Sequence, residues 1–318
     1  AKRGLPAVDA VPGILTYSDF QRFSKIWPAH KRRWGLDGLF PDETTNKLFP
    51  EDWLELAHAL YAILQKHNAE LQAQGRQPKL GQPLALGVDC GRSVSGDLTT
   101  FTIVGRYGWV HSESHHIADT TVTYRKTIDL ARRFKIKPAF IAFDVAIGGP
   151  IADQLNARKG WDVAAVNFGA TENIDREKYH NQRASMYGEL AAAMELRYRV
   201  ADDGTSQKRL RGRLQKMLDT PPGEWPKPWA CLAIPREETE LRRELAVLPR
   251  QHSQRSGALL LPPKDPKPGR KMRPGEFCLR ELLGRSPDRG DSFALAWYAW
   301  QRGIEIRQLA KVSGPLVY

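Results

Sequence analysis

The clearest hydrophobic pattern lies between residues 84 and 168, where short apolar runs alternate with polar turns. The runs at 84–89 and 98–105 are joined by a tight Gly-Asp turn, which predicts an antiparallel pair of buried strands. Three later segments also have the pattern of strands: 109–117, 138–144 and 161–168. Helical spacing predicts helices at 121–134 and 149–158. This order predicts a mixed α/β sheet rather than a purely doubly wound one.

Longer helical patterns flank this region. The predicted helices are 51–72, 183–195, 237–248 and 286–301. The second has Met186, Leu190 and Met194 on one face, which we interpret as core packing. The last begins with Ser286 and Pro287, which suit the cap and first position of a helix.

The remaining segments are polar or rich in Pro and Gly, and they suggest how the chain is divided. Residues 73–83 predict a linker. We therefore expect an N-terminal helical or irregular extension over residues 1–80 and a domain over residues 81–318. Within that domain, 202–228 and 250–280 are basic and rich in Pro, and we expect exposed loops there. Residues 229–234 suggest a short strand.

The composition of the chain indicates which class of partner it would bind. The 318 residues carry a net charge of +12, and this excess favours a polyanion such as nucleic acid. The three cysteines form no CxxC pair, so neither a zinc site nor a disulfide framework is expected. No apolar run has the length of a membrane span, and the N-terminus lacks an apolar signal core. The chain begins at Ala1, and we interpret it as a piece of a longer protein.

Four aspartates have positions that suit metal binding. Asp89 and Asp144 each end a predicted buried strand and precede a glycine-containing loop, where ligand crevices form in α/β sheets. Asp288 and Asp291 lie three residues apart in the first turn of the last predicted helix. Singly, each is more often a turn former or a helix-dipole residue. Together they predict a site for hard divalent cations, with Asp97 as a turn residue or a support behind the ligands.

Six segments resemble the nuclease region of the large subunit of tailed-phage terminases, a likeness that covers roughly residues 81–302. GVDCGRSVSGDLTTFTIVG and FDVAIGGPIADQL resemble its first and second acidic motifs. Their order and spacing make the resemblance more specific than any one motif. The other four segments are YHNQRASMYGEL at 179–190, IPREETELRREL at 234–245, LLLPPKD at 259–265 and LLGRSPDRGDSFALAW at 282–297.

This resemblance implies a ribonuclease-H-like nuclease that cuts double-stranded concatemeric viral DNA during genome packaging. It implies two Mg²⁺ or Mn²⁺ ions, with Asp89, Asp144 and Asp291 as catalytic ligands and Asp288 as an additional ligand. The expected partners are DNA, the terminase small subunit, the motor domain and the portal, in the host cytoplasm and with no membrane. Small residues, Gly290 and Ser292, stand where many relatives have Ala, and we expect them to let the last helix approach the sheet.

Several basic residues are candidates for DNA contact. Lys264 would contact the scissile phosphate or be a solvated lysine, and Asn181 and Arg183 would be structural or face the DNA. Two basic runs would grip phosphates or be solvated loops. The first contains Lys208, Arg209, Arg211, Arg213 and Lys216, and the second contains Lys264, Lys267, Arg270, Lys271 and Arg273.

Three other readings stay open at this stage. A junction resolvase or transposase of the same fold would have similar carboxylates. A sugar-kinase or actin-like ATPase would use Asp-x-Gly motifs for phosphates, although it gives the Asp-x-x-Asp helix no role. A non-catalytic DNA-binding or motor-docking module is the third. No GxxxxGK[ST] phosphate loop occurs in the sequence, so we assign no ATP hydrolysis to it.

Overall fold

A computed structural model provides the structure of the chain. It describes residues 47–76, 82–91, 96–201, 232–253, 256–265 and 277–312, together with Gln21. The chain separates into two compact units, Ala1–Lys47 and Leu48–Tyr318, and nearly all described residues belong to the second. Among the described residues, no helix is both long enough and apolar enough to cross a membrane.

The second unit is built on a mixed five-stranded sheet, which confirms the predicted fold class. The strands lie in the order β3-β2-β1-β4-β5. β1 pairs antiparallel with β2 and parallel with β4, so the predicted antiparallel first pair is confirmed. The bounds are β1 Pro83–Asp89, β2 Thr99–Gly105, β3 Gly108–His115, β4 Ile141–Asp144 and β5 Ala164–Val166.

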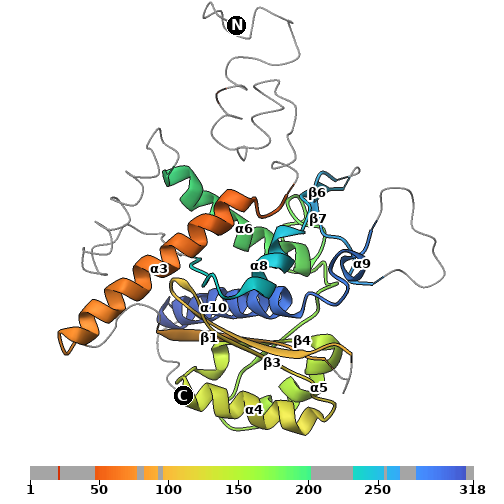
Figure 1. Cartoon of the computed structure of the whole chain (residues 1–318). Helices are drawn as coiled ribbons and strands as arrows, with labels where there is room; N and C mark the ends of the chain where they lie inside the picture. Colours follow the sequence, from red (N-terminus) through yellow and green to blue (C-terminus); the bar gives the residue numbers. More distant parts are fainter. Residues whose placement is uncertain are drawn as a thin grey trace, which may run out of the picture. The chain divides into compact units, whose positions relative to one another are not determined.

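Helices cover both faces of this sheet (Figure 1). The long helix α10 (Asp288–Val312) packs across β1, β2 and β4 on one face. Helices α4 (Thr120–Arg133) and α5 (Val145–Asn156) cover the other face, where α5 contacts β4 and β5. A further layer contacts α10 from outside, and it contains α6 (Gln182–Ala201) and α8 (Thr239–Ala246).

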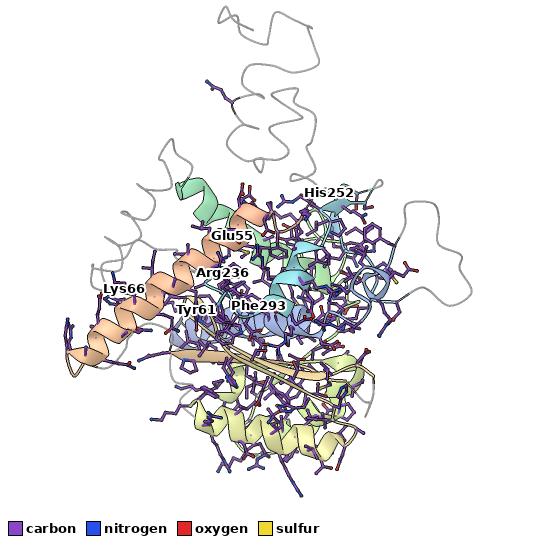
Figure 2. All side chains as sticks on the ribbon, viewed as in Figure 1. Glu55, Tyr61, Lys66, Arg236, His252 and Phe293 are labelled. Atoms are coloured by element: carbon purple, nitrogen blue, oxygen red, sulfur yellow. The ribbon has the colours of Figure 1, made fainter. Side chains whose placement is uncertain are left out.

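Helix α3 (Glu51–Ala73) belongs to the same compact unit as the sheet, although the sequence interpretation placed it in the extension. It contacts α6 and α8, and Trp53 and Leu54 are buried in the common core. Arg236, just before α8, pairs with Glu55 of α3 at 2.6 Å, and Figure 2 shows these two residues near each other. Apolar burial and charge pairs therefore hold α3 on the outer layer.

Three segments differ from the sequence predictions. Helix α5 begins at Val145 rather than 149, because Asp144 caps it by accepting the Ala146 N–H at 3.5 Å. Residues 232–234 form no strand, only an isolated bridge between Ala233 and Gly108, while 229–231 lie outside the described residues.

The expectation of an exposed loop over 250–280 is wrong for its described parts. That stretch contains the hairpin β6 (Gln251–His252) and β7 (Leu259–Leu260) and the start of α9 (Leu279–Leu283). Leu259 and Leu261 are buried in the core, so apolar burial fixes a segment whose charge had suggested a loop.

The contact between β1 and α10 is a backbone contact. A Cβ placed on Gly87 of β1 would lie 2.1 Å from the Ser292 carbonyl oxygen and 2.3 Å from the Ala296 nitrogen. Both atoms belong to the helix backbone and cannot rotate away. The hydroxyl groups of Ser292 and Thr102 add a buried hydrogen bond of 2.6 Å between helix and sheet. A glycine at position 87 therefore sets how closely α10 approaches the strand.

We predict that Gly87→Ala lowers the free energy of unfolding by at least about 3 kcal/mol, the upper range for overpacked cores. The added methyl would push α10 off the sheet. Gly149→Ala is the matched control: its Cβ would meet only a Val145 methyl at 3.3 Å, and alanine favours the helix. Urea unfolding of both variants measures the difference. Equal stability of Gly87→Ala and the parent would contradict this packing argument.

Candidate metal centre

Four carboxylates meet at one end of the sheet. Asp89 ends β1 and Asp144 ends the parallel neighbour β4, and their strands pair in register up to Val88 and Phe143. The first turn of α10 adds Asp288 and Asp291. The charges of Asp291, Asp288 and Asp144 all raise the pKa of Asp89, so the four aspartates lie near one another.

Asp291 is fully buried and is held by three groups. The Arg183 guanidinium contacts both its oxygens, through Nε at 3.0 Å and Nη2 at 3.4 Å. The Tyr187 hydroxyl donates to Oδ1 at 2.9 Å, and the Lys264 ammonium lies 2.8 Å from Oδ2. Arg183 and Tyr187 are four residues apart on α6, so one helix face supplies two of the partners.

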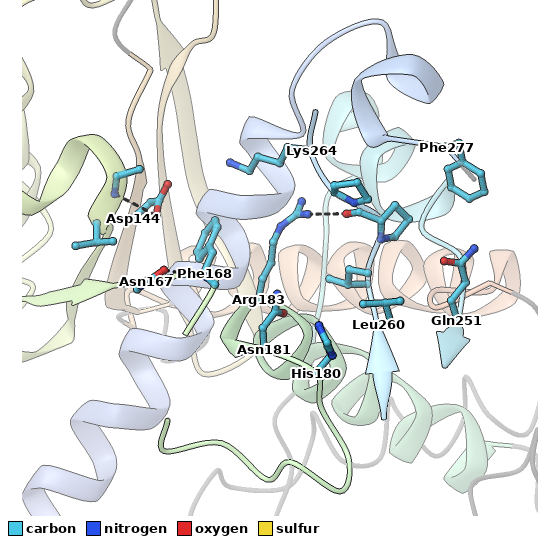
Figure 3. Close-up of a pocket in the computed structure, with 16 residues that line it drawn as sticks. Asp144, Asn167, Phe168, His180, Asn181, Arg183, Gln251, Leu260, Lys264 and Phe277 are labelled. Atoms are coloured by element: carbon cyan, nitrogen blue, oxygen red, sulfur yellow. Dashed lines mark hydrogen bonds between the residues drawn. The ribbon is translucent and has the colours of Figure 1, made fainter. Parts of the chain in front are cut away.

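Lys264 lies between two of the carboxylates. Its Nζ is 2.8 Å from Asp291 Oδ2 and 3.5 Å from Asp89 Oδ2, and its side chain is only 26% exposed. It also lies 5.2 Å from the centre of the Phe168 ring. Of the two readings made from the sequence, a freely solvated lysine is therefore wrong. Figure 3 shows Lys264 on the segment that follows β7.

The loop that carries Lys264 is fastened by Arg280 of α9. The Arg280 N–H donates to the Lys264 carbonyl at 3.0 Å, and its guanidinium pairs with Asp265 at 2.5 Å. The same guanidinium makes two bonds of 2.9 Å to Asp97. Hydrogen bonding to Arg280 lowers the pKa of Asp97. Asp97 thus joins the turn after β1 to the Lys264 loop, and its charge contributes to the raised pKa of Asp288.

The charges at this centre are not balanced by the described side chains. Burial raises the pKa of Asp89 well above its ordinary value; the Lys264 ammonium opposes this, and the neighbouring aspartates raise it further. Burial also raises the pKa of Asp144 and of Asp288. For Asp291, burial is outweighed by Arg183 and Lys264, and the pKa is lowered. Four carboxylates share two close cations, so the site favours an additional positive charge.

The donor set suits a hard divalent cation, because carboxylate oxygens are the ligands that Mg²⁺ and Mn²⁺ prefer. Among the described residues, no group of three or more His, Cys, Asp or Glu side chains is already arranged around an ion position. The Lys264 ammonium lies between Asp89 and Asp291. The chemistry of the four carboxylates nevertheless fits a hard divalent metal ion.

Glu244 is a buried residue that the sequence interpretation missed. Its carboxylate accepts the Gly290 N–H at 2.6 Å and pairs with Arg285 at 2.6 Å. Burial raises its pKa to about 7. Its helix, 237–248, was predicted from sequence, but nothing in the pattern distinguishes Glu244 from a solvated helix charge. It anchors the first turn of α10, which carries Asp288 and Asp291.

Gly290 and Ser292 have different roles from each other. Ser292 faces the sheet, as expected for a small residue there. Gly290 faces away from it, since a Cβ there would lie 2.7 Å from the Tyr187 hydroxyl and 3.3 Å from Glu244 Oε2. The expectation that Gly290 helps the helix approach the sheet is therefore wrong. Its small size instead lets Tyr187 reach Asp291.

The residues predicted to contact DNA lie in different environments. Arg183 was expected either to be structural or to face the DNA. It is buried against Asp291, which fits the structural role. Asn181 caps α6 by accepting the Ala184 N–H at 2.9 Å and also lines a cavity beside the centre. The basic-run residues other than Lys264 lie outside the described residues: Lys208, Arg209, Arg211, Arg213, Lys216, Lys267, Arg270, Lys271 and Arg273.

The sheet and its helices match those of known nuclease domains. A solved structure of the nuclease domain of the large terminase subunit gp2 of bacterial virus Sf6 superposes with a TM-score of 0.51 at 18% identity, covering 79% of this chain and 98% of that one. A point mutant of that domain, with manganese and beta-thujaplicinol, gives 0.52 at 17% identity over the same shares. No family model and no curated protein matches the chain.

These comparisons establish the fold. The chain has a ribonuclease-H-like fold, with a mixed five-stranded sheet flanked by helices. More narrowly, this is the fold of the nuclease domain of a phage large terminase subunit, as the sequence resemblance predicted.

Arg183→Met tests how much Asp291 depends on its buried partner. Removing the cation leaves a buried carboxylate uncompensated, so we expect a loss of about 3–5 kcal/mol in unfolding free energy. Lys178→Met is the control, because Lys178 pairs with Asp175 at the surface with its side chain 69% exposed. The control should lose less than about 1 kcal/mol. Similar losses in urea unfolding would contradict the assigned role of Arg183.

The raised pKa of Asp89 predicts a dependence on pH in metal-free buffer. A carboxyl with a raised folded pKa stabilises the fold while protonated; this contribution is complete below about pH 4 and is lost as the pH rises through the folded pKa. Asp291, whose pKa is lowered, acts in the opposite direction. We therefore expect unfolding free energy to fall less steeply with rising pH in Asp89→Asn than in the parent. Identical slopes would show that Asp89 is not the group responsible.

Proposed function

We propose that this chain is the nuclease domain of a phage or prophage large terminase subunit and that it hydrolyses phosphodiester bonds in double-stranded DNA. The convergence of four carboxylates, a buried lysine and a buried arginine at one end of a ribonuclease-H-like sheet carries the proposal. The Sf6 structure with manganese supports a dependence on divalent metal. The net charge of +12 supports a polyanionic substrate.

In this proposal, Asp89, Asp144 and Asp291 hold two Mg²⁺ or Mn²⁺ ions, with Asp288 as an additional ligand. When bound, two such ions would supply activation of the attacking water and stabilisation of the leaving oxygen in an in-line displacement. Arg183 and Tyr187 keep Asp291 ionised and fixed in orientation. The Lys264 ammonium can leave its carboxylate partners and donate a hydrogen bond to a phosphate oxygen, because it lies at the edge of a cavity.

We further propose that the chain acts on concatemeric DNA during genome packaging, with little sequence preference, because cations that bind phosphates do not read bases. The similarity in fold to nuclease domains of large terminase subunits supports a role in packaging. The proposed partners are the terminase small subunit, the motor domain and the portal, and the proposed place is the procapsid portal in the host cytoplasm.

Plasmid cleavage tests the nuclease proposal. We expect cutting with Mn²⁺ or Mg²⁺ and none with EDTA. Asp89→Asn, Asp144→Asn and Asp291→Asn should each reduce the rate by more than about 100-fold, because loss of a direct ligand should exceed the effect of losing an outer partner. Asp129→Asn, an exposed aspartate on α4, is the control and should cut like the parent.

Three outcomes would contradict the proposal. Asp89→Asn that cuts as fast as the parent would exclude the assigned centre. Strong preference for four-way junctions over linear duplex would instead favour a resolvase. ATP binding by this chain would favour the kinase-like reading, which would leave the Asp288 and Asp291 pair without a role.

A further inference from the structure

A cavity of about 550 Å³ opens directly beside the candidate centre (Figure 3). Its walls come from the start of α5, the segment after β5, the residues before α6 and the segment from Leu260 to Lys264. This volume lies within the range of about 300–1,000 Å³ that is usual for small-molecule sites. An intact duplex is too wide to enter a cavity of this size, whereas a single nucleotide is not.

The two ends of the cavity differ in chemistry. One end contains Asp144, Lys264 and Arg183, which belong to the centre itself. The lining around Leu260 and Phe277 is mostly apolar, and it also includes His180 and Gln251. Figure 3 shows Asp144 on one side of the cavity and Phe277 on the other, with Arg183 between them. The lining therefore suits a ligand that joins a charged, phosphate-like part to an apolar part, as a nucleotide joins its phosphate to its base.

Phe168 lies at the charged end and is half-buried, so part of its ring is open to a ligand. The Lys264 ammonium 5.2 Å from the ring centre places a cation next to the same ring. Aromatic rings that adjoin cations are the usual surfaces on which unpaired bases stack. Phe168 would thus stack on a base while Lys264 contacts its phosphate.

Two amides add polar groups to the walls. Asn167 accepts the Gly169 N–H at 2.9 Å and Asn181 accepts the Ala184 N–H at 2.9 Å, both through Oδ1. Because an amide also carries an NH₂ donor, each can still donate to a ligand. Base edges present carbonyl and ring-nitrogen acceptors. The walls therefore offer stacking and hydrogen bonding within one cavity.

We propose that this cavity receives one unstacked nucleotide of the strand being cut, with its base on Phe168 and its phosphate towards Lys264. The proposal rests on the nuclease function proposed above. Unstacking a base costs free energy, and the cost is least where the base is mismatched or already single-stranded. The enzyme should therefore cut preferentially beside distorted or frayed base pairs, although it reads no sequence.

The test compares cleavage of a short duplex with one central mismatch against the fully paired duplex. The parent should cut next to the mismatch about tenfold faster than in the paired duplex. Phe168→Leu should lose most of this ratio, as should Leu260→Trp, which narrows the cavity from the opposite wall. Phe134→Leu, a half-buried phenylalanine outside the cavity, should keep it. If these substitutions acted only by displacing Lys264, cleavage of both duplexes would slow equally. The ratio of the two cleavage rates would then stay unchanged.

A second measurement needs no cleavage. The deoxyribonucleoside monophosphate of 2-aminopurine should lose fluorescence on stacking in the parent and in Phe134→Leu, and bind about tenfold more weakly to Phe168→Leu. Nucleotide binding without DNA cutting would reject the nuclease function and leave the cavity assignment standing. DNA cutting with an unchanged mismatch ratio in Phe168→Leu and Leu260→Trp would reject the cavity assignment and leave the nuclease standing.

Discussion

The buried charge of Asp291 is the constraint on which this site depends. A carboxylate with no exposed surface stays ionised only if cations and donors reach it inside the protein. Here those groups come from α6 and from the segment after β7, both far in sequence from α10. The fold must therefore bring three separate segments to one point. The small size of Gly290 serves the same end, because it leaves room for the Tyr187 hydroxyl that bonds Asp291.

Burying these carboxylates also costs folding free energy. Asp89, Asp144 and Asp288 all have raised pKa values because burial and mutual repulsion disfavour their charged forms. A protein selected for stability alone would not gather these groups. The surrounding core offsets the cost, since β1, β2 and α10 are among its most completely buried elements. Local destabilisation next to strong packing is what a cation-binding role would require.

The sequence contained enough to predict the sheet and the positions of its acids. Buried strands have a simple signature, and adjacent parallel strands place Asp89 and Asp144 at the same edge. The burial of Lys264 and Glu244 could not be predicted in this way, because each lies in a charged segment whose local pattern resembles solvated surface. Their environment is created by contacts between segments far apart in the chain. The start of α5 was misjudged, because the Asp144 cap begins the helix at Val145 and Pro150 lies inside it.

The backbone contact at Gly87 has a mechanical consequence. Because β1 and α10 touch through main-chain atoms, they can neither slide nor separate without losing the core, so Asp89 and Asp291 move as parts of one rigid body. Lys264 belongs to a different segment. Arg280 bonds this segment to Asp97 in the turn after β1. Any movement of the Lys264 side chain would therefore change the charge beside Asp89 and Asp291 without changing the spacing between these two acids.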